Sequence, residues 1–293
     1  METGQHSSEL GRWRTARRSA DPRLCAFVHG YLASSSQLPS AVRERHLPAL
    51  EVPLLLNFGA PHRRWDAAAP GGWSSRDGAW VVGPHSRPQL TRAEGERQFM
   101  VVRFTPIGAH LFLGLPMHRI ANEAVDLERI DPSLARALMS RVGRANGWAE
   151  RFDAVEALIA ERVAGAEVPM VLRSAWCRLL ASDGRIALAP LAAELDCSHR
   201  TLIARFRTCI GFPPKTVARL LRFNRAVRSL DRRAVGEPYI EAQHAADRPV
   251  GAIPWADLAA DCGYSDQAHL IRDFREFSGS TPAAFLRDVS LLG

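Results

Sequence analysis

The C-terminal third of the chain contains one pattern twice. Residues 191–214 read LAAELDCSHRTLIARFRTCIGFPP, and residues 258–282 read LAADCGYSDQAHLIRDFREFSGSTP. Each copy opens with Leu-Ala-Ala and closes on Gly-x-x-Pro, and each carries a Leu and a Phe four residues apart. That spacing places the Leu and Phe side chains on one helix face. Each copy therefore predicts a short helix, a tight turn and a second helix, which is a helix-turn-helix motif.

The second helix of each motif begins at a residue suited to cap it, Ser198 or Asp266. With the Leu and Phe facing the core, the outward residues are His199, Arg200, Ile203, Ala204 and Arg207 in the first copy and Gln267, Ala268, Ile271, Arg272 and Arg275 in the second. Gln and Arg match the edges of adenine and guanine in the major groove. The sequence thus predicts DNA base reading by His199, Arg200, Gln267, Ala268 and Arg272.

Basic charge concentrates around the first copy. The chain has a net charge of +7, and between residues 200 and 233 there are ten basic residues against one acid, Asp231. From residue 254 to the C-terminus there are three basic residues against six acids. A solvated arginine face is the alternative to a DNA surface, but the duplicated motif favours DNA phosphates as the partner. The expected phosphate contacts are Arg205, Arg207, Lys215, Arg219, Arg222 and Arg275.

The N-terminal part reads differently. Apolar runs at 51–58, 79–82 and 98–104 predict β-strands, and Pro and Gly residues predict a long loop over 60–78. Residues 1–20 are expected to form a flexible tail. Asp131-Pro132 predicts a helix start, and apolar spacing over 152–163 predicts another helix closed by Gly165. We therefore expect a domain over 21–165 and a second over 170–293, with the boundary at 164–169.

Residues 188–286 resemble the DNA-binding domain of AraC/XylS-type transcription regulators. Both motifs match, here 190–207 and 255–276, and the second is close in Leu258 to Tyr264 and Asp266 to Phe274. The resemblance implies seven helices, with a rigid linker helix over 217–230. It also implies that the two recognition helices enter successive major grooves about 34 Å apart.

Three departures from the family pattern bear on that expectation. Asp196 stands where the family usually has glycine, and aspartate tolerates the left-handed conformation. Ile203 and Ala204 replace polar residues, so direct readout by the first motif is expected to be poor. The two caps lie 68 residues apart (266 − 198), because of a long insertion at 231–254.

The N-terminal domain resembles, more weakly, an uncharacterised β-rich module found in some regulators of this type. The matching residues are 82–85, 103–109 and 57–59. In other members the corresponding domain is a cupin-like barrel that binds an effector and often dimerises. The resemblance implies a sensor or dimerisation role here, by analogy of fold.

Two enzymatic alternatives require residue patterns that can be compared with this sequence. A cupin-like metal enzyme clusters histidines, whereas His46, His62, His85 and His110 are scattered in sequence, and His85 is expected to satisfy a turn. A DNA-alkylation-response protein needs a cysteine cluster, whereas the five cysteines are dispersed without a C-x-x-C pair. No enzyme activity, metal or cofactor is expected. Metal analysis would detect the first alternative, and specific DNA retention would detect a regulator.

The sequence contains no apolar stretch of the roughly 20 residues that span a bilayer, and the basic N-terminus lacks the apolar segment of a signal peptide. We expect an α+β protein: a β-rich, cupin-like domain with trailing helices, then an all-α domain with two helix-turn-helix motifs. The expected function is that of a cytoplasmic bacterial transcription activator. Its expected partners are double-stranded DNA, a small-molecule effector, RNA polymerase and a second copy of the chain, with no membrane.

Overall fold

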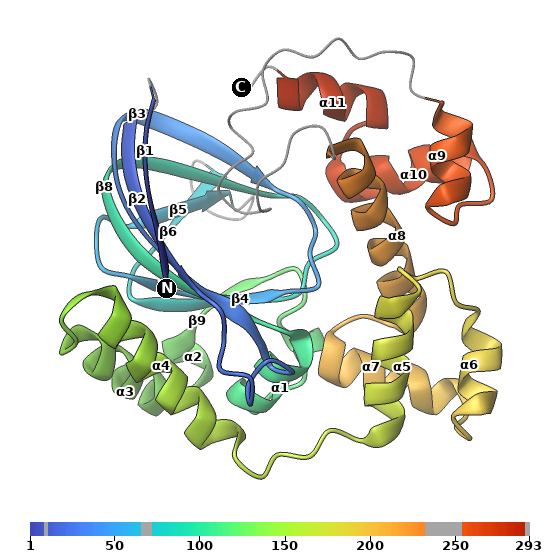
Figure 1. Cartoon of the computed structure of the whole chain (residues 1–293), viewed down its shortest axis with the longest axis horizontal. Coiled ribbons are helices and arrows are strands. Elements are labelled where there is room, and N and C mark those ends of the chain that lie inside the picture. The colour runs from blue at the N-terminus through green and yellow to red at the C-terminus, as the bar shows by residue number, and fades with distance from the viewer. Residues whose placement is uncertain (9–10, 66–71, 232–253, 291–293) are drawn as a thin grey trace.

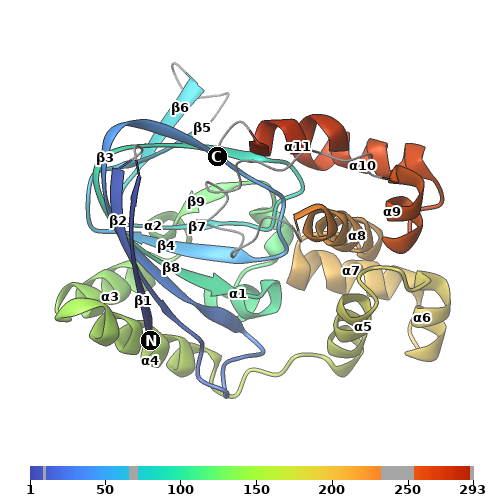
Figure 2. The same ribbon diagram turned by 45° about the horizontal axis from the view of Figure 1, so that its top comes forward.

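A computed structural model of the chain describes residues 1–8, 11–65, 72–231 and 254–290. A curved β-sheet and a group of helices lie side by side, with helices α1 (Pro106–Leu113) and α7 (His199–Ile210) between them (Figure 1). The turned view keeps the same arrangement (Figure 2). The protein is α+β, as the sequence predicts. Among the helices that the structure describes, none has the length and apolar composition of a membrane-spanning segment.

The sheet is antiparallel throughout and contains nine strands within the described residues. They run in the order β1-β2-β3-β8-β4-β7-β9, and β5 adds to β8 and carries β6. The long strand β8 pairs with β3 on one side and with β4 and then β5 on the other. The strands are β1 (Glu2–Ser8), β2 (Gly11–Arg18), β3 (Val28–His46), β4 (Val52–Asn57), β5 (His62–Trp65), β6 (Trp73–Arg76), β7 (Ala79–Val82), β8 (Gln89–Phe104) and β9 (Ala124–Asp126).

Alternation along the strands gives the sheet two different faces. On β4, Leu54 and Leu56 belong to a core shared with the helices after the sheet, whereas Leu55 packs with Trp80 and Val101 in a separate cluster. Leu55 and Trp80 also line a cavity on the concave side of the sheet. One face therefore anchors helices, and the other encloses a cavity.

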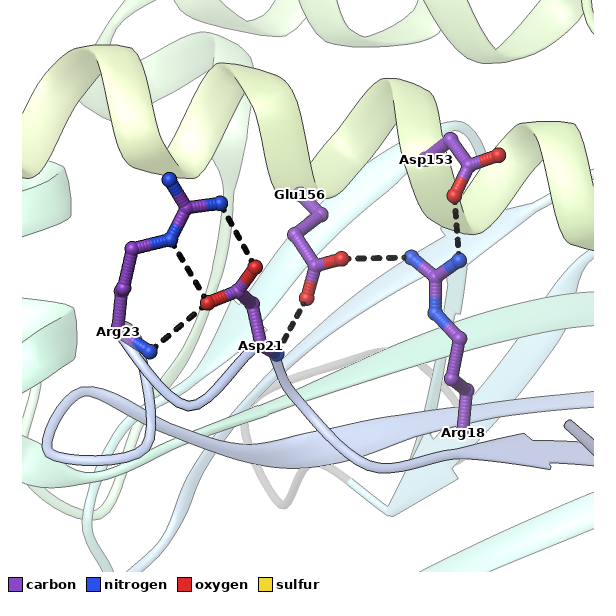
Figure 3. Close-up of polar contacts among 5 residues, drawn as sticks. All are labelled: Arg18, Asp21, Arg23, Asp153 and Glu156. Atoms are coloured by element: carbon purple, nitrogen blue, oxygen red, sulfur yellow. Dashed lines mark hydrogen bonds and ion pairs between the residues drawn. The ribbon is translucent and has the colours of Figure 1, made fainter.

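The first twenty residues correct the expectation of a flexible tail. Strands β1 and β2 form a hairpin that pairs with β3, with Arg18 opposite Tyr31. Figure 3 shows how the end of β2 is fixed: Arg18 donates to Asp153 and to Glu156, and Glu156 accepts from the Asp21 backbone at 2.9 Å. Backbone pairing with β3, and not burial of alternate side chains, holds this segment in the sheet. Its sequence therefore shows no apolar alternation from which the strands could be predicted.

The predicted loop over 60–78 also needs correction. It contains β5 and β6, which pair with each other so that Trp65 lies opposite Trp73, while residues 66–71 lie outside the described part. Strand β5 then pairs with β8, with Arg64 opposite Thr91. Likewise β8 begins nine residues before the predicted strand at 98–104. Charged residues and Gly95 hide these strands from a hydrophobic pattern.

Short elements and two long helices follow the sheet. Thr105 caps α1, accepting from the Gly108 backbone at 3.0 Å. The predicted start at Asp131 is confirmed, because its carboxylate accepts from the Ser133 and Leu134 backbones. The segment contains η2 (Met117–Arg119), α2 (Leu127–Ile130), α3 (Pro132–Gly143) and α4 (Gly147–Val163), with α4 covering the predicted helix over 152–163.

Seven helices are described after residue 164, the number that the resemblance implies: α5 (Met170–Ala181), α6 (Leu188–Glu194), α7, α8 (Pro214–Asp231), α9 (Trp255–Asp261), α10 (Gln267–Ser278) and α11 (Pro282–Ser290). They share one hydrophobic cluster, which also takes in Leu50 and Ile107 from the N-terminal part. Helix α8 has 18 residues and so spans about 27 Å. Most of the predicted insertion, residues 232–253, lies outside the described residues.

Candidate nucleic-acid interface

The first motif consists of α6, a four-residue turn and α7. The turn depends on Asp196, which adopts a left-handed φ of 46° as predicted. The Ser198 hydroxyl then accepts from the Thr201 backbone at 3.0 Å and starts α7. Leu202 and Phe206 are fully buried. The opposite face therefore points outward: His199, Arg200, Ala204 and Arg207 are exposed, and Ile203 is half-buried.

The second motif repeats this construction with α9 and α10. Gly263, at φ 80°, occupies the turn position that corresponds to Asp196. The Asp266 carboxylate accepts from the His269 backbone at 2.7 Å, which holds the pKa of Asp266 below its usual value. Leu270 and Phe274 are fully buried. Four outward residues are exposed on α10: Gln267, Ala268, Arg272 and Arg275.

Arg219 does not lie where the charge pattern predicts. On the linker helix α8 it forms ion pairs with Asp273, at 2.7 Å, and with Glu276, both on α10. The Asp273 side chain is 1% exposed. Hydrogen bonds to Glu276 and to Asp273 raise the pKa of Arg219. Arg219 thus fixes α10 to α8, and its assignment as a phosphate contact is corrected.

Arg222 is also engaged inside the protein. It donates to the Gly184 carbonyl at 2.9 Å and its guanidinium lies 5.7 Å from the Tyr264 ring centre. Further along α8, Arg225 and Arg228 both pair with Asp183. The basic run contains one acid in sequence, but the fold supplies acids from outside the run. Acids from outside the run therefore neutralise much of the linker helix, and the phosphate contact expected of Arg222 remains a prediction.

Basic residues at the first motif remain available to a ligand. Arg200, Arg207 and Lys215 are exposed and Arg205 is half-buried, and within the described residues none forms a hydrogen bond or an ion pair through its side chain. Lys215 lies in the first turn of α8, where the helix dipole favours anions. On α10, Arg272 and Arg275 are likewise exposed and unpaired within the described part of the chain.

The N-terminal part contacts the C-terminal end of α7 and comes near that of α10. A Cβ atom on Gly211, which ends α7 at φ 97°, would lie 2.6 Å from Pro84 Cγ. His118 lies 3.3 Å from the Arg207 carbonyl. A Cβ atom on Gly279, which ends α10, would lie 3.9 Å from Pro88 Cγ. One connection, residues 83–88 between β7 and β8, thus reaches both motifs. No sequence pattern marks this contact, because it joins two domains.

The same connection borders the cavity of the sheet. His85 lines the cavity, and its Nε2 lies 3.1 Å from the Leu47 carbonyl. Its Nδ1 lies 3.4 Å from the Gly83 carbonyl, and a neutral ring can donate to only one of these two carbonyls. Burial lowers the pKa of His85 to about 4.

The cavity gathers histidines that are scattered in sequence. His46 and His62 line it together with His85, whereas His110 lies on α1 and its Nδ1 is 2.8 Å from the Leu115 carbonyl. Within the described residues, no group of three or more His, Cys, Asp or Glu side chains could hold a metal ion. His62 Nδ1 accepts from Arg97 at 2.6 Å, and a guanidinium at that position repels a cation.

Comparison with known families matches two separate parts of the chain. Residues 16–126 match a family described as a domain of unknown function, and residues 191–288 match the helix-turn-helix domain family. Neither description names an enzyme. The second match identifies the AraC-type helix-turn-helix domain at the C-terminus. Comparison with curated proteins finds no match.

Among solved structures, ToxT from Vibrio cholerae is similar over 95% of this chain and 98% of that chain, with 9% identity and a TM-score of 0.43. ToxT from Vibrio cholerae O395 bound to (E)-4-(8-methylnaphthalen-1-yl)but-3-enoic acid is similar over 96% and 100%, with 10% identity and a TM-score of 0.44. An oxalate decarboxylase variant from B. subtilis is similar over 36% and 28%, with 16% identity and a TM-score of 0.24. At these TM-scores, none of the three similarities carries an argument about function.

Proposed function

We propose that the two recognition helices have different roles in DNA binding. The premise is that residues 191–288 form an AraC-type helix-turn-helix domain of a DNA-binding transcription regulator. Helix α10 chooses the sequence through Gln267 and Arg272, whose side chains can bond to base edges. Helix α7 and the start of α8 bind the phosphate backbone through Arg205, Arg207 and Lys215. His199 and Arg200 add base contacts at the first site.

One observation supports this division most directly: the exposed faces of the two helices differ in chemistry. On α7, Ala204 and half-buried Ile203 occupy the middle of the outward face. On α10, half-buried Ile271 and exposed Arg272 occupy the corresponding positions. Major-groove readout needs directed donors and acceptors, and Arg272 supplies donors at the position where α7 has Ala204. The second helix is therefore the better reader of bases.

We further propose that the N-terminal domain is a sensor and that the protein is an activator. The cavity of the sheet would hold a small-molecule effector, and residues 83–88 would transmit its presence. They border the cavity at His85, contact the end of α7 through Pro84, and bring Pro88 near the end of α10. A shift of this connection would change the relative placement of the two helices. An activator would then recruit RNA polymerase, and a second copy of the chain would occupy an adjacent half-site.

Selection of bound fragments from randomised DNA by the full-length protein tests the DNA part of this proposal. We expect an enriched site with two conserved blocks about one helical turn apart, the block under α10 being the more sharply defined. Arg136→Ala, on the exposed face of α3, serves as the control variant and should select the same site. Selection of no preferred site would contradict the proposed function.

A further inference from the structure

The cavity on the concave side of the sheet has a volume of about 90 Å³. A single water needs roughly 10–15 Å³ by this measure, so the space holds a ligand of roughly six to nine non-hydrogen atoms. Its walls combine the rings of Trp80 and Phe99 with polar side chains from β3, β5 and β8. An apolar wall with a few convergent polar groups is the usual composition of a small-molecule site.

Arg97 is the unusual group in this cavity. Its residue is 8% exposed, its guanidinium donates to His62 Nδ1 at 2.6 Å, and it lies 5.1 Å from the Phe99 ring centre. Within the described residues Arg97 has no ion pair. The nearby Glu44 attracts Arg97 without forming an ion pair, so the cost of desolvating the guanidinium is only partly compensated. An anion in the cavity would offset that cost.

The other charges of the cavity wall add to this positive field. Arg64 also lines the cavity, and its Nε donates to Gln89 Oε1 at 2.8 Å. Glu44 is the one carboxylate among the lining residues, and it accepts from the Thr91 hydroxyl at 3.2 Å. Two guanidinium groups thus face a single carboxylate.

The histidines of the wall do not supply charge of their own. Because burial and the nearby Arg97 lower the pKa of His62 to about 3, its ring is neutral at neutral pH. A neutral ring that accepts from Arg97 at Nδ1 carries its proton at Nε2 and remains a donor there. The cavity therefore presents donors and positive charge, which select an anion.

We propose that the cavity binds a small organic carboxylate, whose oxygens pair with the Arg97 and Arg64 guanidinium groups and whose apolar body lies against Trp80 and Phe99. Guanidinium groups bind carboxylates through paired hydrogen bonds. This proposal rests on the proposed function, since it names the chemical class of effector that the sensor domain takes. The aromatic wall distinguishes a carboxylate with an apolar body from inorganic phosphate.

Calorimetry on the full-length protein tests this proposal with matched probes. Benzoate and benzamide have the same shape and differ in charge, hexanoate carries an aliphatic body, and inorganic phosphate carries charge without an apolar body. We expect benzoate or hexanoate to bind at one site per chain at millimolar concentration or below. Benzamide and phosphate should bind at least about tenfold more weakly, since a lost charged contact costs about 1.4 kcal/mol or more.

Variants locate the site. Arg97→Gln keeps a donor for His62 but removes the charge, and it should weaken carboxylate binding about tenfold or more. Without ligand, the melting temperature of this variant should equal or exceed that of the parent. Removal of a buried charge that has no ion-pair partner does not destabilise the protein, whereas removal of an arginine with a purely structural role would lower the melting temperature. Arg64→Gln should weaken binding as well and tests the site independently if Arg97→Gln fails to fold. Arg92→Gln, whose side chain pairs with Glu94 on the same strand, is the matched control and should bind as the parent does.

Absence of binding by every carboxylate probe would overturn the proposal, as would equal binding of benzamide, stronger binding of phosphate, or undiminished binding by Arg97→Gln and Arg64→Gln. DNA retention measured on the same preparation without ligand separates the two ideas. Lost DNA binding with intact benzoate binding contradicts only the proposed function, and the reverse result contradicts only the carboxylate site.

Discussion

The two recognition helices have the same local design and different surroundings. Both α7 and α10 are capped by a side-chain oxygen, bury a Leu and a Phe, and end on a left-handed glycine. Helix α7 packs its C-terminal end on the N-terminal domain, at Pro84 and Met117. Helix α10 is instead fixed to the linker helix through the Arg219–Asp273 ion pair. The comparison teaches that a duplicated motif can be positioned by different forces in each copy.

The largest effect is expected at the support of α10. Arg219→Ala leaves the Asp273 carboxylate buried without its partner, which should lower the free energy of unfolding by about 3–5 kcal/mol. Denaturant titration of the full-length protein measures this change. Arg228→Ala is the control, because its pair with Asp183 is exposed on the arginine side (64%) and should contribute at most about 1 kcal/mol. Equal losses in the two variants would show that Arg219 does not hold α10.

The next effect compares the ends of the two helices. Gly279→Ala strains a left-handed φ of 77° and meets no close neighbour, so it should cost about 1 kcal/mol of stability. Gly211→Ala adds a clash with Pro84 to the same strain and should cost about 2–3 kcal/mol. The difference between the two losses, measured by thermal unfolding, reports the domain contact. Identical losses would mean that the contact at Pro84 does not constrain α7.

The third comparison concerns DNA. Arg272→Ala should weaken binding to the selected site by about 1–3 kcal/mol and relax the preference at one or two base pairs. Arg207→Ala, on α7, should weaken binding to selected and random DNA alike. Competition binding with both DNAs gives the two ratios. Base-specific protection concentrated under α7 would reverse the proposed division of labour.

The smallest effect distinguishes an exposed cation, Lys215, from Arg222, whose side chain bonds within the protein. Lys215→Gln should lower the slope of log affinity against log salt by about one, because one phosphate contact is lost. Arg222→Gln should leave that slope unchanged, because its guanidinium bonds to the Gly184 carbonyl. Filter binding over a range of salt concentrations measures both slopes. A reduced slope for Arg222→Gln would return Arg222 to the phosphate surface.

Local features of the interface could be predicted from sequence. The caps at Ser198 and Asp266, the buried Leu and Phe pairs and the left-handed Asp196 all depend on residues within one or two helical turns. The outward positions follow from the same helical period. Their contacts with DNA remain predictions. The β-hairpin over residues 2–18 was missed because its strands have no apolar alternation and depend on pairing with β3.

The sequence by itself determined the duplicated motif, the helix faces and the α+β division, because helical periodicity and capping act between near neighbours. Only the tertiary structure decided which cations remain exposed and which charges meet in the cavity. Arg219 and Asp273, which form an ion pair, are 54 residues apart in the sequence. Coulomb energy depends on distance in space and on burial, and neither is contained in the order of residues along the chain.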